Sequence, residues 1–415
     1  MPGRQFVIVG GSLAGVKAAE TLRIEGFDGS IVIVDADHEP PYERPPLSKN
    51  ALLGDDDWSV AVLHDEKWYA DHDIDLRLGR RATAIDLDGH TVSIDGDRDP
   101  LRFDRLLIST GADPRRLDVP GADADGVRYL RTMDDARLLQ ARLAERPRVA
   151  VIGAGWIGLE VAAAARTAGA QVTVVEARSA PLLDALGATV ADVFTQLHRD
   201  HDVTFRFGEG VDEILTVGGH VRGVRTSTGA PVPADLVVVG IGVAPNTGLA
   251  EAAGLEVANG VLVDERLQTS HPDVFATGDV ANWLSPVLGY RLRVEHWANA
   301  HDGGEAAGRS MLGKTLGKEG TGYDVLPFFW TDQYDAGIEY AGHVPRDADP
   351  DVVTRGDLSG REFMAFWLSE NRLLAGMHMN VWDTMDAVQD VIRSKRPVDP
   401  AKLADPDVPL DQVYA

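Results

Sequence analysis

Three glycines at positions 153, 155 and 158 have the spacing G-x-G-x-x-G, between the apolar run VAVI and the apolar segment WIGLEVAAAA. This spacing is typical of a turn between a strand and a helix, where backbone N–H groups bind a pyrophosphate and the middle glycine lets it approach closely. The next apolar run, QVTVV, ends in Glu176, which could accept hydrogen bonds from ribose hydroxyls. Glu176 would repel a ribose phosphate, so the motif favours NAD over NADP, although Arg178 could offset part of that exclusion.

A second turn of the same kind lies near the N-terminus, in FVIVGGSLAGVKAAE. Gly10 and Gly15 match the first and third glycines, Ser12 stands at the second position, and the following strand ends in Asp35. The helix between them should bury one face, formed by Leu13, Val16, Ala19 and Leu22. Either turn alone could belong to an ordinary βαβ packing unit. Two in one chain predict two dinucleotides with hydride transfer between them, usually a nicotinamide and a bound flavin.

Lys49 follows the proline-rich segment PYERPP, in a stretch that predicts a short helix from about Pro46 to Gly54. A lysine in the first turn of a helix is unfavourable because it opposes the macrodipole. The stretch by itself favours a surface turn with a solvated lysine.

Glu160 lies in the helical segment LEVAAAAR, which is apolar on all sides and therefore typical of a buried helix. A buried carboxylate needs a partner, because an unpaired buried charge costs several kcal/mol. We expect a cation from elsewhere in the chain, unless one edge of the helix is exposed.

The length, net charge and cysteine count of the chain exclude several classes of function. The chain has 415 residues, 44% of them hydrophobic, enough for about two to four domains. A net charge of −25 argues against a nucleic-acid partner, and the absence of cysteine excludes disulfides, thiolate nucleophiles and thiolate-bound iron–sulfur clusters. His198 and His201 have helical spacing, but the scattered histidines predict no metal site. Neither a secretory signal nor a membrane span is evident, so we expect a cytoplasmic protein.

Seven segments along nearly the whole chain resemble the FAD-dependent NADH:ferredoxin reductases that serve bacterial oxygenases, a family that includes putidaredoxin reductase and biphenyl dioxygenase ferredoxin reductase. The segments, in the family's order, are RPPLSK, LLISTGADPRRL, GWIGLE, VVVGIGVAPN, VFATGDVAN, EHWANA and FFWTDQYD. Ser12 and Trp156 depart from the pattern.

The resemblance implies a glutathione-reductase-like α/β fold with two Rossmann-type dinucleotide-binding domains and a C-terminal α+β domain. The FAD domain would be discontinuous, comprising residues 1–111 and 243–319, with an NADH domain at 112–242 and the C-terminal domain at 320–415. Segments rich in Gly, Pro and Asp lie at these joins, as expected where a chain crosses between domains.

The resemblance also assigns residues to the two dinucleotides. In the FAD domain, Ala82 would contact the adenine, Arg131 the diphosphate, and Asp279 the ribityl chain, while Trp297 would pack near the isoalloxazine unless it is simply a core residue. The full FAD set is Gly10, Ser12, Leu13, Ala14, Gly15, Asp35, Ala36, Arg44, Lys49, Ala82, Thr110, Gly111, Arg131, Gly278, Asp279, Glu295, His296 and Trp297. The NADH set is Gly153, Gly155, Trp156, Ile157, Gly158, Glu176 and Gly242. Lys49 and Glu160 would form a buried catalytic pair beside the flavin.

These assignments imply hydride transfer from NADH to FAD and then single-electron transfer to a ferredoxin, expected to be of the [2Fe-2S] type that serves a Rieske dioxygenase or a P450. The chain would be a monomer or homodimer. Docking of the ferredoxin could use five basic residues that would otherwise be solvated: Arg291, Arg293, Arg309, Lys314 and Lys318. A rubredoxin reductase, and a flavin-switched binding protein resembling apoptosis-inducing factor, remain open. A disulfide reductase is excluded because it needs cysteine.

Overall fold

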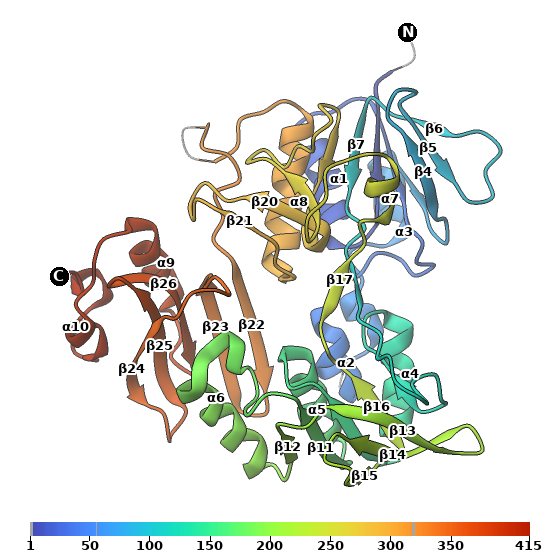
Figure 1. Cartoon of the computed structure of the whole chain (residues 1–415). Coiled ribbons are helices and arrows are strands. Elements are labelled where there is room, and N and C mark those ends of the chain that lie inside the picture. The colour runs from blue at the N-terminus through green and yellow to red at the C-terminus, as the bar shows by residue number, and fades with distance from the viewer. Residues whose placement is uncertain (1–2, 55, 318–319) are drawn as a thin grey trace. The chain divides into compact units, whose positions relative to one another are not determined.

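The structure is a computed structural model that describes residues 3–54, 56–317 and 320–415 (Figure 1). The chain divides into two compact units, each gathered from separate segments. The first unit comprises Met1–Arg44, Ser59–Asp113 and Val243–Pro327, and the second comprises Pro45–Trp58, Pro114–Gly242 and Phe328–Ala415. The three domain boundaries expected from the sequence stay a prediction, and the boundary at residue 319 falls outside the described residues.

The first unit is built on a five-stranded parallel sheet in the order β19-β7-β1-β2-β3. Its strands are β1 (Gln5–Val9), β2 (Ser30–Val34), β3 (Ile74–Arg77), β7 (Arg105–Ile108) and β19 (Val274–Ala276). Two small sheets accompany it, formed by β4 (Ala82–Asp86), β5 (Thr91–Ile94) and β6 (Leu101–Arg102), and by β18 (Val261–Val263), β20 (Ala281–Leu284) and β21 (Arg291–Leu292). Its helices are α1 (Leu13–Ile24), α3 (Glu66–Asp71), α7 (Gly248–Ala252), η3 (Gly278–Val280) and α8 (Trp297–Met311). Such a parallel sheet, whose strands are almost entirely apolar, needs helices on its faces.

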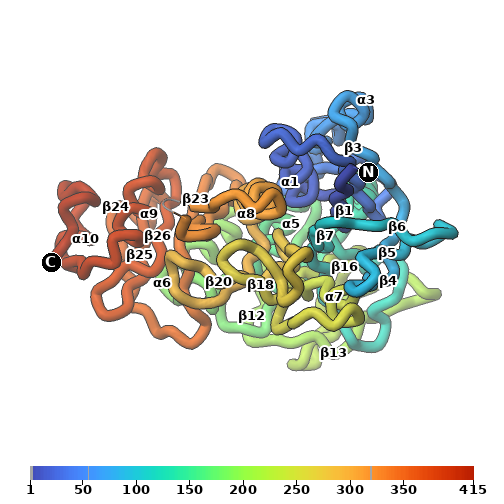
Figure 2. Tube along the Cα trace, turned by 90° about the horizontal axis from the view of Figure 1, so that it is seen from above, coloured from blue at the N-terminus to red at the C-terminus, as the bar shows by residue number. Residues whose placement is uncertain are grey.

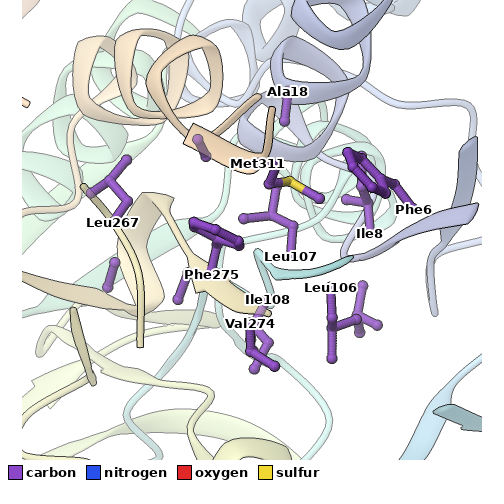
Figure 3. Packing of buried hydrophobic residues seen from close by; sticks show 14 of the residues in the cluster. Phe6, Ile8, Ala18, Leu106, Leu107, Ile108, Leu267, Val274, Phe275 and Met311 are labelled. Atoms are coloured by element: carbon purple, nitrogen blue, oxygen red, sulfur yellow. The ribbon is translucent and has the colours of Figure 1, made fainter. Parts of the chain in front are cut away.

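Helices α1 and α8 pack against each other over this sheet (Figure 2). Two glycines of α8 make the approach possible, since a Cβ on Gly304 would lie 2.5 Å from the carbonyl oxygen of Ala14, and one on Gly308 would lie 2.8 Å from that of Ala18. Figure 3 shows Ala18 and Met311 from these helices above Leu107 and Phe275 of the sheet. The predicted apolar face of α1 is confirmed: Leu13, Val16, Ala19 and Leu22 are buried.

The second unit repeats the five-stranded parallel sheet, in the order β12-β11-β10-β16-β9, with a three-stranded β13-β14-β15 sheet in the place of β4-β5-β6. Its strands are β9 (Val127–Arg128), β10 (Arg148–Ile152), β11 (Gln171–Glu176), β12 (Thr204–Phe207), β13 (Val211–Val217), β14 (His220–Thr226), β15 (Pro231–Pro233) and β16 (Leu236–Val239). Its helices are α4 (Met133–Leu143), α5 (Trp156–Thr167) and α6 (Leu183–Asp200), the last interrupted at Gly187. Both units therefore contain the strand, turn, helix and strand order of a Rossmann-type domain.

The C-terminal part of the second unit is an antiparallel sheet in the order β22-β23-β26-β25-β24, with α9 packed against β23 and β26. The elements are β22 (Phe328–Gln333), β23 (Ala336–Gly342), β24 (Asp351–Asp357), β25 (Glu362–Ser369), β26 (Arg372–Met379), α9 (Met385–Ser394), α10 (Pro400–Ala404) and η5 (Leu410–Gln412). Two further elements, η2 (Trp58–Ala61) and β8 (Ala112–Pro114), run across segment boundaries, and β8 pairs with β17 (Val243–Pro245).

The sequence predicted one short helix from about Pro46 to Gly54, and the prediction of a single continuous helix is wrong. The chain forms a 3-10 turn, η1 (Pro45–Ser48), and then one α-turn, α2 (Asn50–Leu53), with Lys49 between them in a non-helical conformation (φ −121°, ψ −133°). Gly54 ends the segment as predicted, because its φ of 84° is a left-handed conformation that glycine adopts easily. Lys49 is the N-cap of α2 and so still lies at the positive end of a helix, but a helix of four residues has only a small dipole.

Candidate functional site

Both glycine turns have the geometry of a close helix–strand junction. A Cβ on Gly15 would lie 2.1 Å from the carbonyl oxygen of Gly10, and one on Gly158 would lie 2.2 Å from that of Gly153. The third glycine of each motif is therefore required by the packing of the turn. The first is required by its neighbours, because a Cβ on Gly10 or Gly153 would lie 2.2 or 2.4 Å from the carbonyl oxygen of Ser109 or Gly240. Gly153 also has φ +96°, which an L side chain rarely adopts.

The middle position of each turn is different. Ser12 (φ −84°, ψ −171°) and Gly155 (φ −79°, ψ −177°) have the same ordinary extended backbone at the N-caps of α1 and α5. A Cβ on Gly155 would meet no heavy atom of the described residues within 4 Å. The fold of the turn therefore does not require a glycine at 155, whereas the close approach of a pyrophosphate would, so this turn fits a dinucleotide.

The two acids have equivalent positions. The Asp35 carboxylate accepts a hydrogen bond of 2.9 Å from the backbone N–H of Gly11, and the Glu176 carboxylate accepts one of 2.6 Å from that of Ala154. Burial raises the pKa of Asp35 above its ordinary value, opposed by the N–H groups of Asp37 and Gly11 and by the charge of Arg44. Each acid thus fixes its own turn while it lies where a ribose would bind.

Other residues predicted for FAD gather around the first turn. Gly278, at the start of η3, lies so close that its Cβ would be 3.1 Å from Cβ of Ala14, which brings the Thr-Gly-Asp segment with Asp279 to the turn. Thr110 and Asn246 exchange hydrogen bonds of 2.8 and 3.0 Å, and Gly111 accepts one of 2.9 Å from the N–H of Asn246. These contacts join the two stretches of chain that the sequence analysis assigned to the FAD domain, 1–111 and 243–319.

The remaining FAD residues are distributed between the units. Glu295 is exposed, His296 is the N-cap of α8, and Trp297 begins that helix and stacks on His301 at 4.9 Å. Ala36 is exposed and Ala82 is half-buried at the start of β4. Two members of the set, Lys49 and Arg131, belong to the second unit. The roles of all these residues toward FAD stay a prediction.

The residues predicted for NADH lie in the second unit. Trp156 begins α5 and contacts Phe194 and Phe329 edge to face, at 5.6 and 4.8 Å between ring centroids. Ile157 is 48% exposed, as are several other single apolar residues of the chain, so its role toward NADH stays a prediction. Gly242 accepts a hydrogen bond of 2.9 Å from the N–H of Arg115.

Arg178 is paired within the chain. Its guanidinium Nε donates a hydrogen bond of 3.0 Å to Asp184, and a second nitrogen lies 2.9 Å from the same oxygen. Asp184 therefore partly offsets the positive charge of Arg178 that could have bound a ribose phosphate. The negative charge of Glu176 then dominates at the end of β11.

Lys49 and Glu160 form the ion pair that the sequence predicted. The Lys49 ammonium donates a hydrogen bond of 2.8 Å to Oε1 of Glu160, with side-chain exposures of 17% and 6%. The hydroxyls of Ser48 and Thr331 also donate to this carboxylate, the latter at 2.6 Å. A solvated lysine and an exposed Glu160 are both excluded by this geometry. The ammonium is fixed by a fully hydrogen-bonded buried carboxylate, the condition under which a buried pair is tolerated.

The sequence analysis did not assign to the site three polar residues that are linked to Glu160: Thr331, Gln333 and His198. The Gln333 amide donates a hydrogen bond of 3.3 Å to the Thr331 hydroxyl, and His198 Nε2 lies 2.9 Å from the Gln333 carbonyl oxygen. All three are buried, with 1%, 1% and 0% exposure. Two polar residues spaced i and i+2 on the buried face of a strand, here in FFWTDQ, were the available signal.

The basic patch proposed for docking is largely used inside the first unit. The Arg293 side chain is 6% exposed and lies 2.6 Å from Glu295. Arg309 lies 3.1 Å from Glu25, which also pairs with Lys314. Arg291 donates to the carbonyl oxygens of Val263 and Asn282, at 2.6 and 3.0 Å. Lys318 lies outside the described residues. Arg291 is exposed, and the side chains of Arg309 and Lys314 are each 43% exposed, so ferredoxin docking at these residues stays a prediction.

Two family models match the chain. The pyridine nucleotide-disulphide oxidoreductase model matches residues 4–304, and the reductase C-terminal model matches residues 328–414. Among the residues that the structure describes, no helix is both long enough and apolar enough to cross a membrane.

Named relatives match over nearly the full length. Rhodocoxin reductase of Rhodococcus erythropolis is 39% identical over 410 residues, covering 99% of this chain and 94% of that protein. The ferredoxin–NAD(+) reductase component of the anthranilate 1,2-dioxygenase system of Burkholderia cepacia is 39% identical over 411 residues, with 99% of each chain covered. The crystal structure of the covalent putidaredoxin reductase–putidaredoxin complex superposes with a TM-score of 0.93 at 35% identity, covering 99% of this chain and 98% of that chain. The predicted resemblance and fold class are confirmed.

Proposed function

Because the chain belongs to the pyridine nucleotide-disulphide oxidoreductase family, we propose that it is an FAD-containing reductase that passes electrons from NADH to a ferredoxin. The observation that carries the proposal is the duplicated glycine turn. In each copy an acid is hydrogen-bonded to the backbone of the turn, and the middle position adopts the same extended backbone. Relatives named as ferredoxin reductases match nearly the whole chain, which supports the choice of a ferredoxin as acceptor.

Bound FAD would take up a hydride from NADH and release electrons singly, chemistry that amino-acid side chains cannot supply. The chain's own residues would bind and orient. The turn from Gly10 to Gly15 would hold FAD through backbone N–H groups, and the turn from Gly153 to Gly158 would hold NADH in the same way. Correct orientation of the two reactants accounts for a large part of the rate in such reactions.

The Lys49 ammonium would place its proton donors beside the reacting nitrogen of the flavin. Glu160 holds that ammonium through the 2.8 Å ion pair, so the group is oriented before the reaction begins. The positive charge would stabilise negative charge that develops on the ring system during reduction. Lys49 thus acts directly, and Glu160 acts by fixing it.

The coenzyme is proposed to be NADH. The charge of Glu176, whose carboxylate accepts from the backbone N–H groups of Ala154 and Arg178, would repel a ribose phosphate, and the Arg178 side chain pairs with Asp184. The acceptor must be a separate protein, because a chain without cysteine holds neither a redox disulfide nor a thiolate-bound cluster. We propose a [2Fe-2S] ferredoxin of a dioxygenase or P450 system. The cytoplasmic location and the monomeric or homodimeric state remain predictions.

The test is an anaerobic titration of the purified protein, followed by absorbance of the bound flavin, with NADH and NADPH compared. We expect stoichiometric bleaching by NADH and much slower bleaching by NADPH. Cytochrome c reduction through a panel of [2Fe-2S] ferredoxins, with rubredoxin included, then identifies the acceptor class. A purified protein that binds no flavin, or turnover with rubredoxin alone, would refute the proposal.

A further inference from the structure

Glu160 is connected to a chain of buried hydrogen bonds that extends away from Lys49. From Glu160 Oε1 the chain passes through the Thr331 hydroxyl (2.6 Å), the Gln333 amide (3.3 Å) and His198 (2.9 Å). The phenol oxygen of Tyr334 lies 3.4 Å from the other ring nitrogen of His198. The array therefore joins α5, β22 and α6, three elements far apart in the sequence.

The hydrogen bonds of the array all point the same way. An ionised carboxylate only accepts, so the Thr331 hydroxyl donates to Glu160 and accepts from the Gln333 NH₂ group. This fixes the Gln333 carbonyl toward His198, so His198 Nε2 must carry the proton and Nδ1 is left to accept from Tyr334. Burial lowers the pKa of His198 to about 4, which agrees with a neutral ring of this tautomer.

The composition of the array excludes one function. A primary amide does not pass a proton along unless it changes tautomer, so the chain is unsuited to proton conduction. The array instead provides a series of hydrogen bonds that all point in one direction, and the last donor in the series is the Thr331 hydroxyl, which donates to the Glu160 carboxylate. Together with Ser48 and Lys49, Thr331 gives Glu160 three hydrogen-bond donors, which fix the orientation of the carboxylate.

We propose that Thr331, Gln333 and His198 are positioning residues that hold the Glu160 carboxylate in place and aimed at Lys49, an inference that rests on the proposed flavin reduction by NADH. Residues of the C-terminal segment would in this way set the geometry of the lysine that serves the flavin. The array orients Thr331, Thr331 orients the carboxylate, and the carboxylate orients the ammonium.

The first test removes the donor on Glu160 with Thr331→Val and restores it with Thr331→Ser. Thr195→Val is the matched control, because Thr195 is also buried and its hydroxyl donates only to a carbonyl of its own helix, Ala191, at 2.9 Å. Stopped-flow flavin reduction at saturating and limiting NADH separates the limiting rate from the apparent affinity. We expect Thr331→Val to lower the limiting rate roughly tenfold with little change in NADH affinity. Thr331→Ser should be close to wild type, and Thr195→Val should be indistinguishable from it.

The second test measures the tautomer of His198 directly and does not depend on enzyme activity. In ¹⁵N-histidine-labelled holoprotein, the ring nitrogen shifts of His198 should show a neutral Nε2–H tautomer at neutral pH, assigned by comparison with His198→Gln. A protonated Nδ1, or a Thr331→Val variant whose reduction rate equals that of Thr195→Val, would overturn the inference. A wild-type protein that NADH does not reduce would instead refute the proposed function, and the inference with it.

Discussion

At the scale of single residues, the most informative contact is the ion pair of Lys49 and Glu160. The two residues are far apart in the sequence. The need of a buried carboxylate for a cation predicted only that Glu160 has a partner, and the family resemblance identified Lys49 as that partner. What could not be predicted is the break between η1 and α2 that leaves Lys49 non-helical, since short proline-rich segments carry little periodicity. The Thr331–Gln333–His198 array was hidden for another reason, because it depends on tertiary contacts that one strand or helix does not reveal.

Replacing Lys49 by Ala should slow flavin reduction by NADH about 100-fold, as expected for loss of a preorganised charged donor. The Glu160 carboxylate would also lose its cation. Stopped-flow bleaching under anaerobic conditions measures the effect, and Lys67→Ala is the control, because Lys67 is exposed and pairs only with Asp71. Rapid reduction of the Lys49 variant would remove Lys49 from its proposed role.

At the scale of elements, the glycines of the two turns fall into two groups. The first and third are required by the packing of the turn and its neighbours, whereas a glycine at the middle position would be required only by a bound pyrophosphate. The sequence predicted both turns and both following acids, and these elements are present as expected. The docking patch was less predictable, because a basic residue in a sequence does not reveal its partners. Arg293 is buried against Glu295, so its reversal to Glu would disturb the fold of the first unit, and would not report on a partner protein.

Gly155→Ala and Gly158→Ala should therefore have opposite consequences. Gly158→Ala forces a methyl against the Gly153 carbonyl at 2.2 Å and should destabilise the protein by about 1–3 kcal/mol or more. Gly155→Ala meets open space, so stability should change by less than about 1 kcal/mol. Its NADH affinity should fall roughly tenfold because the methyl obstructs the pyrophosphate, a moderate loss since the other turn already carries Ser12.

Urea denaturation and NADH titration of the two variants measure stability and binding separately. A Gly155→Ala protein with unchanged NADH affinity would show that the pyrophosphate does not approach this residue. A stable Gly158→Ala protein would contradict the packing of the turn.

At the scale of the whole molecule, two parallel sheets that match in four of their five strands and an antiparallel C-terminal sheet supply the framework for the site. Family motifs spread over nearly the full chain allowed this architecture to be predicted. The grouping of Pro45–Trp58 with the second compact unit was not, because it depends on contacts rather than on position in the sequence.

Buried His198 predicts how stability depends on pH. Its pKa is lowered from 6.5 to about 4, chiefly by burial, so the folded state prefers the neutral ring. The unfolded chain binds the proton first, so this contribution is fully present above about pH 6.5 and is lost as the pH falls toward 4. Urea unfolding between pH 7 and 4 should show a shallower loss of stability in His198→Gln than in wild type. Equal slopes would mean that His198 does not contribute.

The hydrogen bonds from Gly11 to Asp35 and from Ala154 to Glu176 have a consequence for coenzyme engineering. A change of preference toward a phosphorylated coenzyme would begin by removing the charge of Glu176, yet the same carboxylate accepts the N–H of Ala154. A redesign with alanine would leave that amide without its acceptor and loosen the turn. Glutamine would keep an acceptor for the Ala154 N–H without the charge, but its NH₂ group would then face the N–H of Arg178, which donates to the other Glu176 oxygen at 2.8 Å, so a change of coenzyme must also rebuild the loop at Arg178.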